Sequence, residues 1–544
     1  MGTSVISDYI RKIRPVLWLL PGFLLWAAFP PMGEKTDVLF ALAPLLWVTR
    51  RRDPRTSAKR WFAAGMFFWI ATLSWMPAIV KNGGPWPLVV LGWFVLAAYC
   101  AGYFALFGWL SARIWRWVRG GAWWRRLFAV LVAEPVLWCG IELVRSRLFG
   151  GFAWNQLGVV PANGGFAAPA AIGGVYLLSA VVILINGTVA GIIERVRREA
   201  PRWSSVEILL AFGLVYSIYL AASPVGAVRL SQNGDASGLI KVALVQRNFP
   251  CVFKGREANP YETYGRLLAN FEMLKPDVVV LPESGLCEFG PVDQQGAVNF
   301  AKFVRERTGA SLLAGGTRFH DGKEFNSAAL YAADGEIRIY DKVHLVPFGE
   351  FIPGDKWITS LQKLAPVGSC TPGELKLIAL ETGDGGRKAG IAICYEDTDS
   401  AQMRRLANMG AGLLVFITND SWFSDSIEAE QHAWQATARA VETGLSVVRV
   451  GNNGVTGVIS PDGRATWLIG EEGRPLVDSQ GTMLDRVPVV PDNGKRGPLT
   501  QYAAFGDIPL AVAFALLIVA MILVKYKAYG KHRSMSMQIG EDLR

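Results

Sequence analysis

Long apolar runs constrain this chain more than any other feature of its sequence. A membrane-spanning helix needs about 20 apolar residues, because the hydrocarbon core of a bilayer is about 30 Å thick. Such runs dominate the first 222 residues and return once near the end, at residues 15–29, 37–49, 61–80, 86–110, 127–144, 172–193, 206–222 and 508–524. The first two are short and favour a shallow hairpin. The pattern predicts a membrane protein with a bundle of about eight transmembrane helices.

The composition agrees with a membrane protein. Hydrophobic residues make up 51% of the chain and charged residues only 18%, whereas soluble domains are richer in charge. Most of the 20 Trp lie in the first 203 residues, as aromatic belts at the membrane interfaces would place them. The net charge of +10 does not predict nucleic-acid binding, because the basic residues cluster at the ends of apolar runs.

The loops between the apolar runs alternate between strongly and weakly basic. Three loops and the tail carry most of the positive charge: Arg50, Arg51, Arg52, Arg55, Lys59 and Arg60; Arg113, Arg116, Arg119, Arg125 and Arg126; Arg195, Arg197, Arg198 and Arg202; and Lys525, Lys527, Lys531 and Arg533. The loops between them carry only Lys35, then Lys81, then Arg145 with Arg147. Cytoplasmic loops are enriched in Lys and Arg. Both termini are therefore predicted to be cytoplasmic, with the segment between the seventh and eighth runs outside.

That outer segment has the texture of an α/β domain. Strands are predicted at 240–246, 277–281, 311–315, 326–331, 336–340, 389–393, 413–418, 446–450 and 455–459, and helices near 259–274, 293–308, 399–409 and 427–443. Strands that alternate with helices indicate a central sheet covered by helices. The stretch after Arg464 is rich in Gly, Pro and Asp and predicts an extended return to the last helix.

These observations divide the chain into four parts. Residues 1–222 form the transmembrane bundle and residues 223–507 the outer α/β domain. Residues 508–524 form the last transmembrane helix, and residues 525–544 a basic cytoplasmic tail.

Three reactive residues stand at the ends of predicted strands, where open α/β sheets place their functional groups. Glu283 follows Val278–Leu281, Lys342 follows Ile337–Tyr340, and Cys394 follows Gly390–Ile393. A carboxylate can take the proton of a thiol, and an ammonium can stabilise the oxyanion that forms on acyl attack. A helix after Cys394 would also lower the pKa of the thiol. The set predicts acyl-transfer chemistry.

Spacing alone leaves a plainer interpretation open, because a Cys at the end of an apolar strand is commonly a small buried hydrophobe. The six Cys include no Cys-x-x-Cys pair and no Cys/His cluster at zinc spacing, so neither a metal nor a cofactor is predicted. The pairing of Cys251, Cys287 and Cys370 cannot be derived from the sequence.

Longer motifs around these residues decide between the two interpretations. Leu281-Pro282-Glu283-Ser284, the segment from Tyr340 to Glu350, and Ile393-Cys394-Tyr395-Glu396 resemble the three signature regions of the nitrilase superfamily. Lys-x-His-Leu-Val-Pro-Phe-Gly-Glu and Ile-Cys-Tyr-Glu, in particular, resemble the apolipoprotein N-acyltransferase family. Further matches are Asn419-Asp420-Ser421-Trp422-Phe423, Gln431-His432, Arg439 and Asn452-Asn453-Gly454. The resemblance covers residues 240–465 closely.

The resemblance implies a four-layer αββα domain and a set of roles. Glu283 would be the general base, Lys342 the oxyanion stabiliser and Cys394 the nucleophile. Glu350 and Glu396 would position Lys342 or an incoming amine, with a purely structural charge network as the alternative. Tyr395 matches a position beside the nucleophile. Trp154, in Phe152-Ala153-Trp154-Asn155-Gln156, would either face the site or anchor the chain at the membrane interface.

The implied reaction transfers an acyl chain in the bacterial inner membrane. Cys394 would take it from a phospholipid, with phosphatidylethanolamine the expected donor, and pass it to the α-amine of an S-diacylglyceryl-cysteine on a lipoprotein. The enzyme would act as a monomer with its catalytic domain in the periplasm. Apolar loop residues would close over the thioester: Phe348, Phe351, Ile352, Trp422 and Phe423. Water would thereby be excluded.

Two other functions remain open at this point. A membrane-tethered amidase or nitrile hydrolase would use the same three residues. A helical transporter with a binding domain is disfavoured, because the apolar runs contain few ionisable residues, namely Glu134, Glu142 and Glu207. The chain also departs from the family where Gly255 follows Lys254. The family typically has Trp there, so this contact with the acyl chain is absent or supplied elsewhere.

Overall fold

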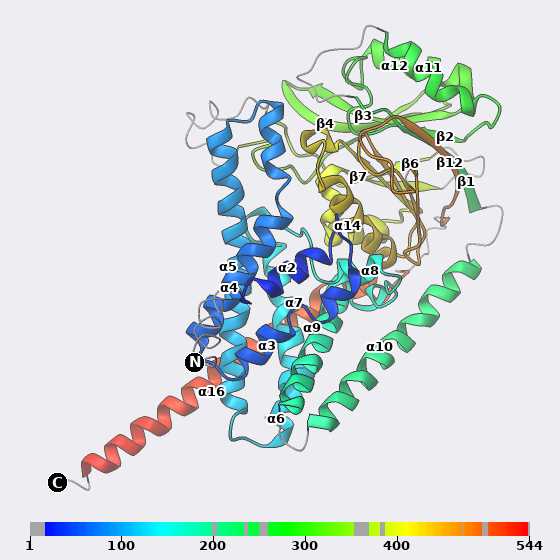
Figure 1. Ribbon diagram of the computed structural model, residues 1–544. Coiled ribbons are helices and arrows are strands. Elements are labelled where there is room, and N and C mark those ends of the chain that lie inside the picture. The colour runs from blue at the N-terminus through cyan, green and yellow to red at the C-terminus, as the bar shows by residue number, and fades with distance from the viewer. Residues whose placement is uncertain are drawn as a thin grey trace, which may run out of the picture.

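The computed structural model describes residues 17–197, 204–232, 238–249, 259–352, 369–380, 387–471, 473–491 and 499–541. Long helices occupy one end of the molecule and an α/β domain the other (Figure 1). Within the described residues, six helical segments are long and apolar enough to cross a membrane: 54–82, 86–118, 123–145, 170–196, 205–223 and 508–525. The membrane class predicted from the sequence is confirmed.

The helical part contains ten labelled α-helices. They are α2 (Leu20–Ala27), α3 (Ala43–Thr49), α4 (Pro54–Thr72), α5 (Trp86–Val118), α6 (Trp123–Phe128), α7 (Glu134–Arg145), α8 (Val159–Asn163), α9 (Ala170–Val196), α10 (Ser204–Gln232) and α16 (Ile508–Glu541). Helices α2 and α3 have 8 and 7 residues, too short to span a bilayer at 1.5 Å per residue. Within the residues that the structure describes, neither of the two short apolar runs therefore forms a full span. The shorter turns are η1 (Lys35–Leu39), η2 (Met76–Asn82), η3 (Ala129–Ala133) and η4 (Leu148–Gly150).

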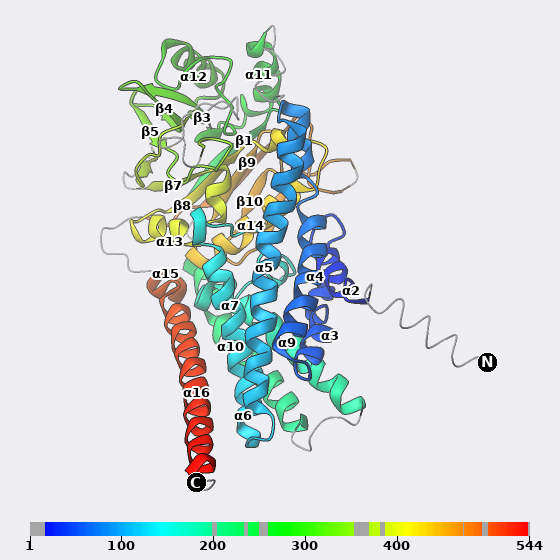
Figure 2. The same cartoon turned by 90° about the vertical axis from the view of Figure 1, so that its left-hand side faces the viewer.

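The basic loops meet at the end of the bundle farthest from the α/β domain, where α6 lies (Figure 2). Arg126 and Arg50 both bind Glu194 there, at 2.6 and 3.2 Å, and Arg119 donates to the backbone carbonyl of Arg50 at 3.1 Å. The weakly basic loop after α7 lies at the opposite end, since Arg147 binds Asp399 of the α/β domain at 3.0 Å. The two kinds of loop thus occupy opposite ends of the bundle.

Two six-stranded sheets form the centre of the α/β domain. Their orders are β12-β1-β2-β3-β4-β5 and β11-β10-β9-β8-β7-β6. The strands are β1 (Leu239–Gln246), β2 (Val278–Val280), β3 (Ser311–His320), β4 (Lys323–Tyr331), β5 (Ile337–Asp341), β6 (Leu377–Ala379), β7 (Lys388–Ile393), β8 (Leu413–Thr418), β9 (Val447–Gly451), β10 (Gly457–Ile459), β11 (Ala465–Trp467) and β12 (Gly481–Pro488). Strands β1, β2 and β3 are parallel, as are β7, β8 and β9.

Three hydrophobic cores hold the layers of this domain together. Leu244, Val280, Ile391 and Val415 belong to the core between the two sheets. A second core joins the first sheet to α11 (Pro260–Leu268), η7 (Ala269–Phe271) and α12 (Gln295–Thr308), and a third joins the second sheet to α13 (Ser400–Asn408) and α14 (Glu428–Thr443). The four-layer αββα arrangement implied by the family resemblance is confirmed, with two sheets in place of the single central sheet that the strand pattern alone indicated. The short α15 (Gln501–Phe505) precedes α16.

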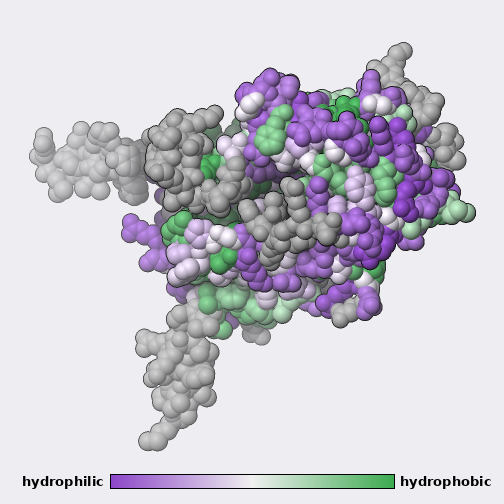
Figure 3. All heavy atoms as spheres, turned by 90° about the horizontal axis from the view of Figure 1, so that it is seen from above, coloured by the Kyte–Doolittle hydropathy of each residue, from purple (hydrophilic) through white to green (hydrophobic). Residues whose placement is uncertain are grey.

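The bundle covers the outer face of α14 and adds a further layer. The hydrophobic core of the bundle extends to Ala438 and Val441 of α14, and the two views agree that α14 lies between the second sheet and the bundle (Figures 1 and 2). The opposite face of the domain, seen from above, is mostly hydrophilic where it is not grey (Figure 3). One half of the domain therefore faces the bundle and the other faces solvent.

Candidate active site

Strand ends carry the three residues that the sequence singled out. Glu283 lies three residues after β2, Lys342 directly follows β5, and Cys394 directly follows β7. Glu283 and Lys342 thus belong to the first sheet and Cys394 to the second. The core between the sheets also contacts Cys394, which keeps part of its side chain accessible.

Lys342 is buried among carboxylates. Its Nζ donates to Glu350 Oε1 at 2.8 Å and lies 3.7 Å from Glu283 Oε1. The Asn326 amide donates to both carboxylates at 2.7 Å and so sets their spacing. Burial lowers the pKa of Lys342, but Glu350, Glu283 and Cys394 outweigh burial and raise that pKa above its usual value. Lys342 is therefore a stable cation and can stabilise an oxyanion.

Cys394 is held in an unusual backbone conformation. Its φ is +53°, in the left-handed region that side chains other than Gly rarely adopt. Cys394 also begins the short helix η9 (Cys394–Thr398). Such strain costs about 1–3 kcal/mol and persists only where the surroundings over-determine it. The turn is therefore one of the strongly constrained parts of the domain.

The expected lowering of the thiol pKa by a helix N-terminus is wrong. Burial and the nearby Glu283 raise the pKa of Cys394 well above its usual value, and Lys342 offsets this only in part. The N-terminus of α13 is occupied instead by Asp399, whose carboxylate accepts from the backbone N–H groups of Ala401 and Gln402. The resting thiol is thus neutral, and its nucleophilic form needs a base.

Glu283 has the properties that such a base requires. Burial raises the pKa of Glu283 above its usual value despite the opposing effect of Lys342. A raised carboxylate pKa reduces the gap to the thiol, which favours proton transfer between them. Glu283, Lys342 and Cys394 interact electrostatically with one another. The structure therefore brings the three residues together.

The two further carboxylates do different things. Glu350 contacts Lys342 directly, and its Oε2 accepts from the backbone N–H of Val346 at 2.7 Å. Glu396 is fully buried and accepts from the backbone N–H groups of Val343, His344 and Ile393 at 2.8–3.0 Å. It also accepts from the Tyr340 hydroxyl at 3.0 Å. Glu396 therefore fastens the Lys342 loop to the Cys394 turn and is a structural residue.

Aromatic residues line the junction with the bundle. Trp154 is 2% exposed, stacks on Tyr395 with ring centroids 6.5 Å apart, and donates to Gln431 Oε1 at 2.9 Å. It therefore faces the catalytic domain and is not an exposed interface anchor. The backbone carbonyl of Trp422 accepts from Asn82 of the bundle at 2.9 Å.

The apolar loop residues differ in exposure. Phe348 is 68% exposed, whereas Ile352 is buried and Phe351 half-buried. Phe423 packs edge-on against Trp75 with centroids 4.7 Å apart. Phe348 is thus the member of the set that is most available to a substrate.

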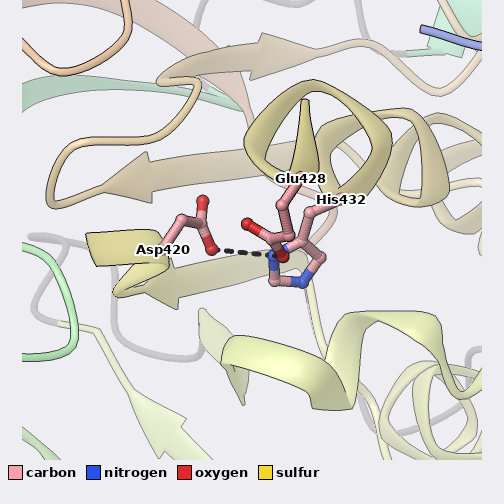
Figure 4. Close-up of side chains that lie close together, drawn as sticks. All are labelled: Asp420, Glu428 and His432. Atoms are coloured by element: carbon pink, nitrogen blue, oxygen red, sulfur yellow. Dashed lines mark hydrogen bonds and ion pairs between the residues drawn. The ribbon is translucent and has the colours of Figure 1, made fainter. Parts of the chain in front are cut away.

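A second cluster lies beneath the Cys394 turn. Asp420, Glu428 and His432 place ligand-type atoms within 4.8 Å of one another (Figure 4). Both ring nitrogens of His432 face carboxylates, however: Nδ1 lies 2.9 Å from Asp420 and Nε2 3.0 Å from Asp397. Arg449 contacts the same two carboxylates. The charges of the two cations, His432 and Arg449, balance those of the two carboxylates, Asp397 and Asp420, without a metal. These four residues form a buried ion network.

Sequence reasoning missed part of this site. Asp397, Arg449 and Asn326 were not singled out, since their roles depend on contacts between residues far apart in the chain. Asp420, His432 and Arg439 were noticed as motif matches without a role. Gly255 and Cys251 lie outside the described residues.

The fold and the site together define a class of protein. Two stacked sheets with outer helices, and a Cys, a Lys and a Glu gathered at strand ends, are the features of a nitrilase-like domain. The carbon-nitrogen hydrolase family matches residues 241–479. An amidase structure from Nesterenkonia sp. overlaps 47% of this chain and 93% of its own, with 20% identity and a TM-score of 0.34.

The bundle narrows the class to one family. The apolipoprotein N-acyltransferase N-terminal domain family matches residues 21–188. A protein of Geobacter metallireducens named apolipoprotein N-acyltransferase is 33% identical over 84% of this chain and 87% of its own. One of the same name from Chromobacterium violaceum is 28% identical over 98% of each chain. The chain belongs to the apolipoprotein N-acyltransferase family.

Proposed function

We propose that this protein transfers an acyl chain from a phospholipid, through a thioester on Cys394, to the N-terminal α-amine of a diacylglyceryl-cysteine on a lipoprotein. The carrying observation is the convergence of Lys342 and Glu283 from one sheet with Cys394 from the other, next to a membrane bundle. Phosphatidylethanolamine is the expected donor, and the enzyme acts as a monomer.

In the first step Glu283 takes the thiol proton and the Cys394 sulfur attacks the ester carbonyl of the lipid. Lys342 stabilises the resulting oxyanion. Such electrostatic stabilisation is the largest contribution to the rate enhancement in many acyl transfers. The tetrahedral intermediate expels the glycerol oxygen, which receives the proton from Glu283. The products are a thioester and a lysophospholipid.

In the second step the amine attacks the thioester and Glu283 accepts the amine proton. The Cys394 sulfur leaves as a thiolate, which recovers this proton from Glu283. The site stays productive only if water is kept from the thioester. The buried junction around Trp154 and Tyr395 and the exposed Phe348 support such shielding. An amidase with the same residues would need neither a lipid-facing bundle nor protection from water.

We also propose that the α/β domain is periplasmic and that the bundle lies in the inner membrane. The meeting of the basic loops at the opposite end of the bundle supports this orientation. Reporter fusions after residue 235 should be active in a periplasmic assay, and fusions after residue 56 should not. The reverse pattern would contradict the topology.

The test of the first step is direct. Purified protein incubated with phospholipid alone should gain the mass of one acyl chain, and hydroxylamine should remove it. Cys394→Ala should gain none, while Cys370→Ala, which removes a second thiol near Glu350, should gain it normally. Acylation of Cys394→Ala would overturn the assignment of the nucleophile.

A further inference from the structure

The turn that carries Cys394 is held by contacts from several directions. Glu396 binds the Lys342 loop, as described above. Arg439 of α14 donates to the carbonyl of Thr398 at 2.9 Å, and the Thr398 hydroxyl donates to the carbonyl of Tyr395 at 2.8 Å. Asp397, three residues after the nucleophile, is bound by His432 and Arg449. The strain at Cys394 is therefore maintained by its neighbours.

The contact with Asp397 belongs to the buried ion network. Its four members are at most 2% exposed, and they alternate in charge. His432 and Arg449 each touch both Asp397 and Asp420, so neither carboxylate depends on a single partner. Thr418 adds a hydrogen bond to Asp420 at 2.8 Å. The network therefore joins the Cys394 turn to the end of β8 and to α14.

The geometry favours a charged His432. Each ring nitrogen faces a carboxylate oxygen, at 2.9 and 3.0 Å, and both contacts are hydrogen bonds with His432 as donor when both nitrogens carry a proton. Burial lowers the pKa of His432, but Asp397 and Asp420 more than offset burial and Arg449, raising that pKa to about 10. Burial and Asp420 raise the pKa of Glu428, 3.6 Å away, well above its usual value. These shifts favour the imidazolium form of His432 and the protonated form of Glu428.

We propose that His432 is a positioning residue for the nucleophile: its Nε2–H bond to Asp397 holds the strained Cys394 turn so that the sulfur faces Lys342 and Glu283. His432 touches no reacting atom and acts through Asp397. The role rests on the proposed thioester chemistry. The Asp420 bond at Nδ1 anchors the imidazole from the other side.

His432 also faces the bundle. The Trp154 ring lies over it with centroids 5.5 Å apart, and Trp154 also stacks on Tyr395, next to the nucleophile. Trp154 and Trp75 both donate to Gln431, the neighbour of His432 on α14. The positioning contact is thus built into the junction between the bundle and the catalytic domain.

A matched pair of substitutions separates the two bonds of His432. Asn places an amide N–H₂ near the position of Nδ1, and Gln places one near that of Nε2. Both remove the charge. His432→Gln thus keeps a donor for Asp397, whereas His432→Asn keeps one for Asp420. The exposed His320→Gln serves as the control, because its side chain is 57% exposed on β3.

The measurement is single-turnover thioester formation with a phospholipid, read by intact-protein mass spectrometry. The amplitude reports the folded, competent fraction and the rate constant reports positioning. We expect His432→Asn to lower the rate constant about 10²-fold at unchanged amplitude, as a displacement of about 1 Å does. The rate constant should fall far less in His432→Gln, and it should not change in His320→Gln.

Three results would overturn the inference: equal losses in the two variants, a larger loss in His432→Gln, or a fall in amplitude alone. If neither His432 variant folds, Asp397→Asn is measured in their place. A wild-type rate constant of thioester formation in Asp397→Asn would also overturn the inference. A wild-type protein that forms no thioester would instead contradict the proposed function.

Discussion

The two halves of the α/β domain share an architecture but differ in what covers them. Helix α12 buries one face, with Ala297, Phe300 and Val304 directed to the first sheet, and leaves the rest to solvent. Helix α14 is buried on nearly all sides, because the bundle packs on the face that the second sheet leaves free. The half next to the membrane also supplies Cys394. The half that faces solvent supplies Glu283 and Lys342.

This difference explains why α14 can carry so many buried polar residues. Gln431 accepts from Trp75 and Trp154 and donates to the carbonyls of Pro30 and Thr72. Buried polar groups are tolerated only when they are hydrogen-bonded. The bundle provides these partners, so the second half of the domain is completed by the membrane part of the chain.

A large effect on stability is expected at Arg439. It forms a buried ion pair with Glu442 at 2.7 Å, and Glu442 in turn accepts from the backbone N–H of Val175 in the bundle. Arg439→Met would leave that carboxylate buried without its cation, at a cost of about 3–5 kcal/mol. Glu306→Ala on the exposed face of α12 should cost less than about 0.5 kcal/mol. Thermal unfolding in detergent measures the stability of both variants. Similar losses of stability in the two variants would contradict the proposed difference between the halves.

A large effect on the rate of thioester formation is expected in the solvent-facing half of the domain. Lys342→Ala should slow thioester formation by roughly 10²–10³-fold, since removal of one oxyanion contact commonly does so. Membrane insertion should be unchanged, and the amplitude of the reaction reports any loss of competent protein separately from the rate constant. Single-turnover acylation checks the rate, and near-normal thioester formation would remove Lys342 from the assigned role.

A loss of stability is also expected at the junction itself. Gln431→Leu leaves two indole N–H groups and two carbonyls without partners, each costing about 1–3 kcal/mol when buried. The matched change Gln295→Leu on α12 breaks an exposed bond to Asn299 worth only about 0.2–0.5 kcal/mol. Equal shifts in the unfolding temperature would show that the bundle does not stabilise α14 through these contacts.

A further effect on stability depends on pH. The pKa of His432 is raised from 6.5 to about 10, so its stabilising contribution is complete below pH 6.5 and is lost as pH rises through about 10. The slope in between is at most about 1.4 kcal/mol per pH unit. The unfolding temperature of the wild type should fall between pH 7 and 10. The unfolding temperature of His432→Gln should fall less over this pH range. Parallel plots of unfolding temperature against pH for the two proteins would contradict the charge assigned to His432.

Local patterns predicted most of the fold. The buried strands β1, β7, β8 and β9 were expected because their runs are rich in β-branched and other apolar residues, with only Lys241 in β1 and Arg449 in β9 interrupting them. Strand β12 lies in the stretch after Arg464, whose Gly, Pro and Asp content predicted an extended return. In the structure most of its residues are half-buried, and it pairs antiparallel with β1 at the edge of the first sheet. The pairing of β12 with β1 is a long-range contact, which the composition of β12 alone does not predict.

The candidate site divides in the same way. Glu283, Lys342 and Cys394 stand in continuous motifs and were expected to meet. Asp397, His432 and Arg449 come from η9, α14 and β9, and their contact depends on how these elements pack. The raised thiol pKa also depends on burial and on Glu283, neither of which a helix following in sequence reveals.

The central claim is that the thioester awaits an amine and not water. Protein carrying the preformed acyl group should stay acylated in buffer for longer than one turnover, then discharge when a diacylglyceryl-cysteinyl peptide is added. The same peptide with its α-amine blocked should leave the acyl group in place. Discharge by water as fast as by the free-amine peptide would contradict the transferase account and favour an amidase.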